Sequence, residues 1–324
     1  MESGKKFDVI CIGQIIQDVM VAGIPCTALM EERDSFMAEE TLLSTGGDAA
    51  NQAVTLARLG NRTALLGRLD RGSVGTMVFG EFEREGVDTS LLVRPEECVN
   101  ITSIVMVQPG GHHKFFIGPG RNYELGIGDV NLEDISRARI VTAGSLFGLG
   151  ALDREGIDKV FRRAKEAGAV TVADMTYDMH KIGARAFDRL YPDIDYLMPS
   201  YDEAVFVTGE REPDKIADAF LKAGAGNVVL KLGDKGCFFK NSGERFYTDP
   251  FSVVPVDTTG CGDNFVAGFI HELLKGMPHK VCTEFACGIG GLNSLGLGAH
   301  RIVRSEMHVE EFMGKTARVR FDRR

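Results

Sequence analysis

The sequence predicts an α/β fold, in which helices flank a doubly wound, mostly parallel sheet that carries a small second sheet as a lid. Short β-rich runs and amphipathic helical segments alternate along most of the 324 residues, which is typical of a parallel sheet covered on both faces. Two mixed β segments, at residues 17–45 and 98–121, interrupt that alternation. With 44% hydrophobic residues, the chain can bury a sizeable core.

The N-terminal part of the chain contains the first strand and helix units. An apolar run at 8–13 predicts a buried strand. Residues 47–59 place small apolar residues at helical spacing ahead of Gly60, which predicts a helix with a glycine stop. A strand at 63–66 and a helix at 77–85 follow.

The interrupting segments have the character of half-exposed strands. Residues 101–107 alternate between apolar and polar, and 113–117 can return as the second strand of a hairpin after a glycine turn. We expect residues 17–45 and 98–121 to pair into a small sheet over the carboxyl edge of the main strands, where ligands bind in such folds. Ordinary surface hairpins are the alternative.

From residue 122 onward, strands and helices alternate one by one. The core domain is expected to comprise residues 1–16, 46–97 and 122–324, and the lid 17–45 and 98–121. The elements predicted in the last part are a strand at 140–142, a helix at 153–167, a strand at 170–173, a helix before Tyr191, a strand at 196–198, helices at 202–208 and 216–223, and a strand at 228–232.

The composition argues against several classes of function. Asp and Glu number 46 against 37 Lys and Arg, and the net charge of −9 repels nucleic acid and anionic membranes. No apolar run approaches the ~20 residues that span a bilayer, and no secretory signal precedes the first strand. Seven cysteines are scattered without a C-x-x-C pair. We therefore expect a cytoplasmic protein that binds no nucleic acid, membrane or zinc.

The most informative stretch is a glycine loop at 257–263, D-T-T-G-C-G-D, which precedes a helical stripe of apolar residues. Glycines let backbone amides approach an anion closely, and the start of the following helix favours a phosphate oxygen. Asp263 would stand beside that phosphate, where a carboxylate can accept the proton of an attacking hydroxyl. The alternative interpretation of Asp263 is a helix N-cap.

With this loop, the sequence resembles the PfkB carbohydrate kinases, also called the ribokinase family, over nearly the whole chain. The resemblance implies a ribokinase-like fold. It also implies that the loop supplies an anion hole and a catalytic base, which fall here on Gly260, Cys261, Gly262 and Asp263. Cys261 stands where alanine is usual, and we interpret it as a small packed side chain rather than a nucleophile.

A second family signature, G-G-x-x-x-N, concerns the sugar. The resemblance implies that Gly46 and Gly47 let the sugar lie against the backbone, and that Asn51 bonds its hydroxyls. Asp18 matches an early aspartate of the family that holds two sugar hydroxyls. Asp48 places a carboxylate where ribokinases carry lysine, which favours a neutral sugar over a sugar phosphate.

Other acceptors stay open. Sugar-acid kinases of the family can also carry G-G-D, and Arg121 could either hold an acidic substrate or be a solvated lid residue. A nucleoside kinase and a non-catalytic sugar-binding regulator are further alternatives. A dinucleotide oxidoreductase is disfavoured, because no G-x-G-x-x-G follows the first strand.

Further family elements imply ATP, Mg²⁺ and K⁺ sites. Glu203 would order hydrated Mg²⁺ between the phosphates. For the K⁺ site, the alternative is that Asp257 merely caps the loop. The implied nucleotide residues are Ser200, Lys231, Gly233, Gly236 and Thr258, with Ser200 and Lys231 in place of the usual asparagine and threonine, and the implied K⁺ residues are Asp257, Thr259, Asn293 and Gly298.

These expectations define one reaction. The chain would transfer the γ-phosphoryl group of ATP to a primary hydroxyl of a non-phosphorylated ketose such as fructose, or of a ribose-like sugar. Nucleotide and catalytic residues would lie in the core domain, and the lid would close over the sugar site to exclude water. The family resemblance also implies a homodimer formed through the lid.

Overall fold

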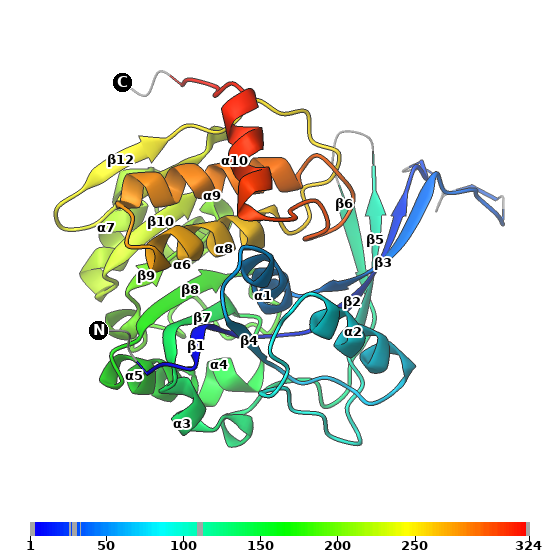
Figure 1. The fold of residues 1–324 in the computed structure, drawn as a ribbon, viewed down its shortest axis with the longest axis horizontal. Helices are drawn as coiled ribbons and strands as arrows, with labels where there is room; N and C mark the ends of the chain where they lie inside the picture. The colour runs from blue at the N-terminus through cyan, green and yellow to red at the C-terminus, as the bar shows by residue number, and fades with distance from the viewer. Residues whose placement is uncertain (1–3, 26, 28–30, 33, 109–112, 322–324) are drawn as a thin grey trace.

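The structure is a computed structural model that describes residues 4–25, 27, 31–32, 34–108 and 113–321. Its main sheet has the strand order β12-β11-β10-β9-β8-β7-β1-β4, with helices on both faces (Figure 1). The pairs from β4 to β10 are parallel, and β11 and β12 add an antiparallel edge. The strands are β1 (Phe7–Ile12), β4 (Thr63–Leu66), β7 (Ala138–Leu146), β8 (Val170–Met175), β9 (Tyr196–Leu197), β10 (Asn227–Lys231), β11 (Cys237–Lys240) and β12 (Arg245–Thr248).

Two apolar cores lie on opposite faces of the main sheet. Successive residues of β1 alternate between them, since Ile10 and Ile12 belong to one core and Val9 and Cys11 to the other. Helices α5 and α7 cover the first core, and α1, α8 and α9 cover the second, so the predicted doubly wound fold is confirmed. The helices are α1 (Asp48–Arg58), α2 (Ser73–Arg84), α3 (Leu132–Ile135), α4 (Ala151–Glu155), α5 (Ile157–Glu166), α6 (Tyr201–Thr208), α7 (Pro213–Ala223), α8 (Cys261–Leu274), α9 (His279–Asn293) and α10 (Glu306–Lys315).

A separate four-stranded sheet stands beside the main sheet, in the order β3-β2-β5-β6 (Figure 1). Both interrupting segments contribute to it, because β2 pairs with β3 antiparallel and with β5 in parallel, and β5 pairs with β6 antiparallel. Its buried face packs against Leu297, from the chain after α9. The turn predicted between β5 and β6 lies outside the described residues. The strands are β2 (Ile16–Ala22), β3 (Glu40–Gly46), β5 (Ile101–Val107) and β6 (His113–Ile117).

Two predicted helices are wrong. The segment at 153–167 forms two helices, since Gly156 ends α4 and begins α5. The helix predicted before Tyr191 is not found, because residues 176–190 run through turns. The Asp178 carboxylate accepts two backbone amides there, and such local bonds compete with helix formation. None of the helices in the described part of the chain has the length and apolar character of a membrane span.

Candidate active site

The glycine loop that should bind phosphate is held from behind by a buried carboxylate. Asp257 is fully buried, and its oxygens accept bonds from the Thr259 amide at 2.9 Å, the Thr259 hydroxyl at 2.7 Å and the Gly298 amide at 3.0 Å. Gly260 has a φ of 70°, and a side chain there would overlap the Ala299 carbonyl. This position therefore requires glycine.

Asp263 lies in the first turn of α8, three residues after the N-cap Gly260. The interpretation of Asp263 as an N-cap is therefore wrong. Its Oδ2 accepts a 2.7 Å bond from Nδ2 of Asn51 on α1. Burial and, next, the charge of Asp48 raise the pKa of Asp263 well above that of an ordinary aspartate. A buried carboxylate with a raised pKa beside a cavity is suited to accept a proton.

A cavity of about 710 Å³ opens between the ends of β8 and β10 and the start of α8. Phe251, Phe265 and Ala286 make part of its wall apolar, and loop residues make the rest polar, a combination that suits a base and its phosphates. The residues expected from the sequence to line it, and which do so, are Ser200, Glu203, Lys231, Gly233, Gly236, Thr258, Gly260, Cys261, Gly262 and Asp263.

Lys231, at the end of β10, extends toward the glycine loop. Its ammonium pairs with Asp174 at the end of β8, and its Nζ lies 3.4 Å from the position that a Cβ on Gly262 would occupy. Burial would lower the pKa of Lys231, but Asp174 and Glu203 raise it above its usual value. Lys231 is the one basic side chain among the described residues that line the cavity. Sequence reasoning missed Asp174, because a lone aspartate at a strand end belongs to no motif.

The expected sugar residues lie where β2 and β3 reach the start of α1. Burial, followed by the charges of Asp48 and Asp257, raises the pKa of Asp18 to about 7. A side chain on Gly46 would overlap the Asp18 carboxylate. Gly47 adopts a φ of 93° and turns the chain from β3 into α1. The two glycines thus set Asp18 beside the first turn of α1.

Asp48 begins α1 and lines the cavity. Burial raises its pKa, against the opposing effects of the Ser145 hydroxyl and the Lys231 ammonium. Arg121, in contrast, is exposed and bridges Val99 near the start of β5. Asp48 therefore lies on the cavity wall, whereas Arg121, like Asp18, Gly46, Gly47 and Asn51, is not among the described residues that line it.

The residues expected to hold metal ions offer oxygen ligands. Glu203 borders the cavity, and one of its carboxylate oxygens accepts the Ser200 amide at 2.7 Å. Asn293 donates through Nδ2 to the carbonyls of Thr259 and Ala299, while its buried Oδ1 has no hydrogen-bond partner in the described part of the chain. An orphaned carbonyl oxygen suits a monovalent cation behind the loop. On the other side, His113 of β6 brings Nδ1 to 3.9 Å from the Asp257 carboxylate.

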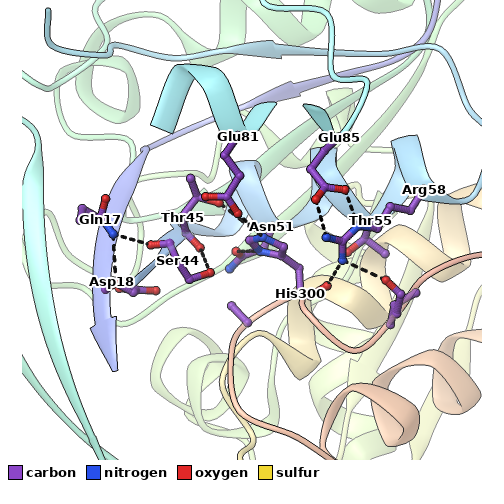
Figure 2. Close-up of polar contacts among 12 residues, drawn as sticks. Gln17, Asp18, Ser44, Thr45, Asn51, Thr55, Arg58, Glu81, Glu85 and His300 are labelled. Atoms are coloured by element: carbon purple, nitrogen blue, oxygen red, sulfur yellow. Dashed lines mark hydrogen bonds and ion pairs between the residues drawn. The ribbon is translucent and has the colours of Figure 1, made fainter. Parts of the chain in front are cut away.

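Sequence reasoning also missed a buried histidine beside Asn51. The Nδ1 atom of His300 lies 3.0 Å from Asn51 Oδ1, and its Nε2 lies 3.3 Å from Glu81 Oε1. Figure 2 shows these side chains in a row from α2, through His300, to α1. His300 stands alone after a glycine-rich stretch, so no spacing pattern could reveal it.

Comparison with known proteins assigns most of the chain to one group. Residues 6–302 match the pfkB family of carbohydrate kinases. The chain is 26% identical to ribokinase of Haemophilus influenzae, over 84% of this chain and 88% of that protein. It is 28% identical to 2-dehydro-3-deoxygluconokinase of Bacillus subtilis, over 76% of this chain and 79% of that protein. A ribokinase-like protein of E. coli, solved with ATP and Mg²⁺, has a TM-score of 0.82 at 20% identity, covering 95% of this chain and 99% of that one. The expected ribokinase-like fold is thereby confirmed.

Proposed function

The chain belongs to the pfkB family of carbohydrate kinases, and we propose that it transfers the γ-phosphoryl group of ATP to a primary hydroxyl of a non-phosphorylated sugar. The acceptor is a ketose such as fructose, or a ribose-like sugar. One observation carries the proposal. Asp263, a buried carboxylate with a raised pKa, borders a nucleotide-sized cavity and is bonded to Asn51, close to the carboxylate of Asp48.

The reaction follows from this placement. Asp263 accepts the proton of the sugar hydroxyl while the hydroxyl oxygen forms a bond to the γ-phosphorus. The bond from that phosphorus to the β,γ-bridging oxygen breaks, and ADP leaves with the electron pair. The amides of Gly260 and Gly262 stabilise the charge on the transferring group, while the Cys261 amide donates to the Thr258 carbonyl at 3.2 Å. Asn51 keeps Asp263 oriented through its hydrogen bond.

The acidic character of the sugar side supports an uncharged acceptor. The charge of Asp48 contributes to the raised pKa of Asp18, so a second carboxylate acts on the one proposed to hold the sugar hydroxyls. A phosphate group on the sugar would be repelled there. A sugar acid, of the 2-keto-3-deoxygluconate kind, would meet the same repulsion from these two carboxylates.

Two cations complete the proposal. When bound, Mg²⁺ neutralises charge on the ATP phosphates, and Glu203 would hold its water shell. K⁺ would lie behind the loop, near Asp257, Thr259, Asn293 and Gly298. The orphaned Oδ1 of Asn293 supports this second site. We expect faster turnover in potassium than in sodium buffers, and equal rates would contradict the proposed K⁺ site.

An ADP-coupled assay with Mg·ATP tests the function, using fructose, other ketohexoses, ribose, sugar acids and nucleosides. We expect strong turnover on a neutral sugar, and a fall of about 10² to 10⁴-fold in Asp263→Asn, with sugar binding nearly intact. Asp195→Asn is the matched control, because Asp195 bonds Thr171 at the amino end of β8, away from the cavity. If only a sugar acid or only a nucleoside is phosphorylated, that class of compound replaces the neutral sugar as the acceptor. Full activity of Asp263→Asn would contradict its role as the base. Folded protein that binds ATP but phosphorylates none of these compounds would indicate an untested substrate, whereas folded protein that does not bind ATP would support the regulator.

We also propose that the second sheet closes over the sugar as a lid and pairs two copies of the chain. Its outward face carries a cross-strand row of Leu43, Val19, Ile104 and Phe116. Leu43 is 58% exposed and Ile104 44%, as an apolar contact surface would be in a free subunit. Ile104→Asp should yield a monomer in light scattering, with Val254→Asp as the control on another exposed apolar residue. A monomeric wild-type chain would contradict the dimer.

A cytoplasmic location is part of the same proposal. The substrate ATP is abundant there, and the six cysteines that the structure describes are all free thiols, five of them buried. Fractionation of cells that express the tagged full chain would test it, with recovery in a membrane or secreted fraction as the contrary result.

A further inference from the structure

A row of four side chains ends at the proposed base. Glu81 of α2 contacts His300, and His300 contacts Asn51 (Figure 2). Asn51 in turn donates to Asp263. His300 is only 1% exposed, and its Nε2 also lies 3.4 Å from the Thr45 hydroxyl. No solvent can therefore take the place of these contacts.

Hydrogen-bond chemistry fixes the direction of the row. An ionised Asp263 can only accept, so Asn51 must turn its NH₂ group toward it. The other end of the Asn51 amide, the carbonyl Oδ1, then faces His300 Nδ1 at 3.0 Å. A carbonyl is also only an acceptor, so Nδ1 of His300 must carry the hydrogen. The imidazole thus determines which end of the amide reaches the base.

Glu81 explains why the imidazole stays in place. Burial would raise the pKa of Glu81, but the bond and the charge of His300 lower it below its usual value. Glu81 therefore remains a carboxylate and an acceptor, 3.3 Å from Nε2. With acceptors on both sides, the ring of His300 gains nothing by rotating.

We propose that His300, held by Glu81, is a positioning residue that keeps the Asn51 amide donating to the base Asp263. The inference rests on the proposed function of Asp263. Without the Nδ1 donor, nothing holds the Asn51 carbonyl, so the side chain is free to rotate away from Asp263. The base is then misplaced relative to the sugar hydroxyl.

A purely structural role for His300 is the competing explanation. Its backbone carbonyl accepts a bond from Arg58, which also forms an ion pair with Glu85 at 2.6 Å (Figure 2). This second set of contacts anchors the same chain segment without using the imidazole. Glu85→Gln is therefore a matched control, because it weakens the anchor and leaves the Nδ1 contact to Asn51 untouched.

The test compares two substitutions of similar size. His300→Leu removes the donor, whereas His300→Asn keeps an N–H close to the Nδ1 position. We expect His300→Leu to lower kcat about 10- to 100-fold with the KM for ATP unchanged, and His300→Asn to restore much of it. Since His300 acts through Asn51, adding His300→Leu to Asn51→Ala should cause no further loss. Equal kcat in the wild type and His300→Leu, or full additivity with Asn51→Ala, would overturn the inference.

A measurement that needs no sugar separates this inference from the proposed function. A crystal structure of His300→Leu should show the Asn51 side chain rotated away from Asp263, and that of Glu85→Gln should show it in place. If His300→Leu does not fold, Glu81→Gln serves instead. An unmoved Asn51 refutes the positioning role even if the wild type is an active kinase. A rotated Asn51 supports it even if no tested sugar is phosphorylated, in which case only the proposed function fails.

Discussion

Lys231→Met removes the one positive side chain among the described residues of the cavity wall. The Nζ of Lys231 lies 3.4 Å from the Cβ position of Gly262, which places the ammonium about one contact distance from a phosphoryl group on the glycine loop. Two unit charges roughly 4 Å apart interact by about 4 kcal/mol at an effective dielectric constant near 20. The Asp174 carboxylate offsets part of that charge. We therefore expect roughly 3 kcal/mol, or about 10²-fold in kcat.

The measurement is kcat and KM for Mg·ATP at saturating sugar. Lys240→Met is the matched control, because Lys240 also pairs with aspartates, Asp214 and Asp218, but on α7 and outside the cavity. The decisive variant combines Lys231→Met with Asp174→Asn. If Lys231 only neutralises Asp174, removing both charges should restore the rate. If Lys231 stabilises the transferring group, the double variant should stay slow, so a recovered rate would refute the reasoning.

Three further outcomes are expected. Gly46→Ala should raise the KM for the sugar at least tenfold, with the KM for ATP unchanged, because the new methyl group would displace the Asp18 carboxylate; an unchanged sugar KM would contradict the role of Asp18. Asp48→Asn should move the acidic limb of the kcat profile to lower pH, since the Asp48 charge helps to raise the pKa of Asp263, which must be ionised to act as base; a limb that stays in place would count against this. Iodoacetamide at pH 7 should leave activity intact, because burial raises the pKa of Cys261 to about 12, whereas rapid inactivation lost in Cys261→Ala would show a reactive thiol.

Most of the fold could be predicted from the sequence, because its strands and helices have clear periodicity and glycine stops. The strand at Thr63–Leu66 and the helix that begins at Asp48 lie where the pattern puts them. The sequence predicts one helix at 153–167 where the structure has two, because a single glycine within an apolar stripe does not alter the periodicity. Before Tyr191, the Asp178 carboxylate accepts two backbone amides where the sequence predicts a helix. A sequence pattern does not show which amides a single carboxylate will bond.

The candidate site was predictable only where it forms motifs. The glycine loop and the G-G-D-A-A-N stretch are contiguous, so their residues could be named in advance. Asp174 and Lys231 are 57 residues apart, and His300 and Glu81 are 219 residues apart. These pairs exist because parallel strands bring distant ends together at one edge, and because α2 packs beside the chain that follows α9. The sequence around one residue of each pair therefore gives no indication of its partner.

The junction between the two sheets has a mechanical consequence. β3 ends at Gly46 and α1 begins at Asp48, so Gly47 alone joins the second sheet to a helix of the main core. Gly46, Gly47 and Asp48, which we propose contact the sugar, therefore form the connection itself. If the second sheet swings as proposed, its movement would pass through Gly47 to the start of α1, which carries Asp48 and, three residues later, Asn51. Opening of the second sheet would then also shift Asn51, which holds the proposed base Asp263. The chain would therefore hydrolyse little ATP while no sugar is bound.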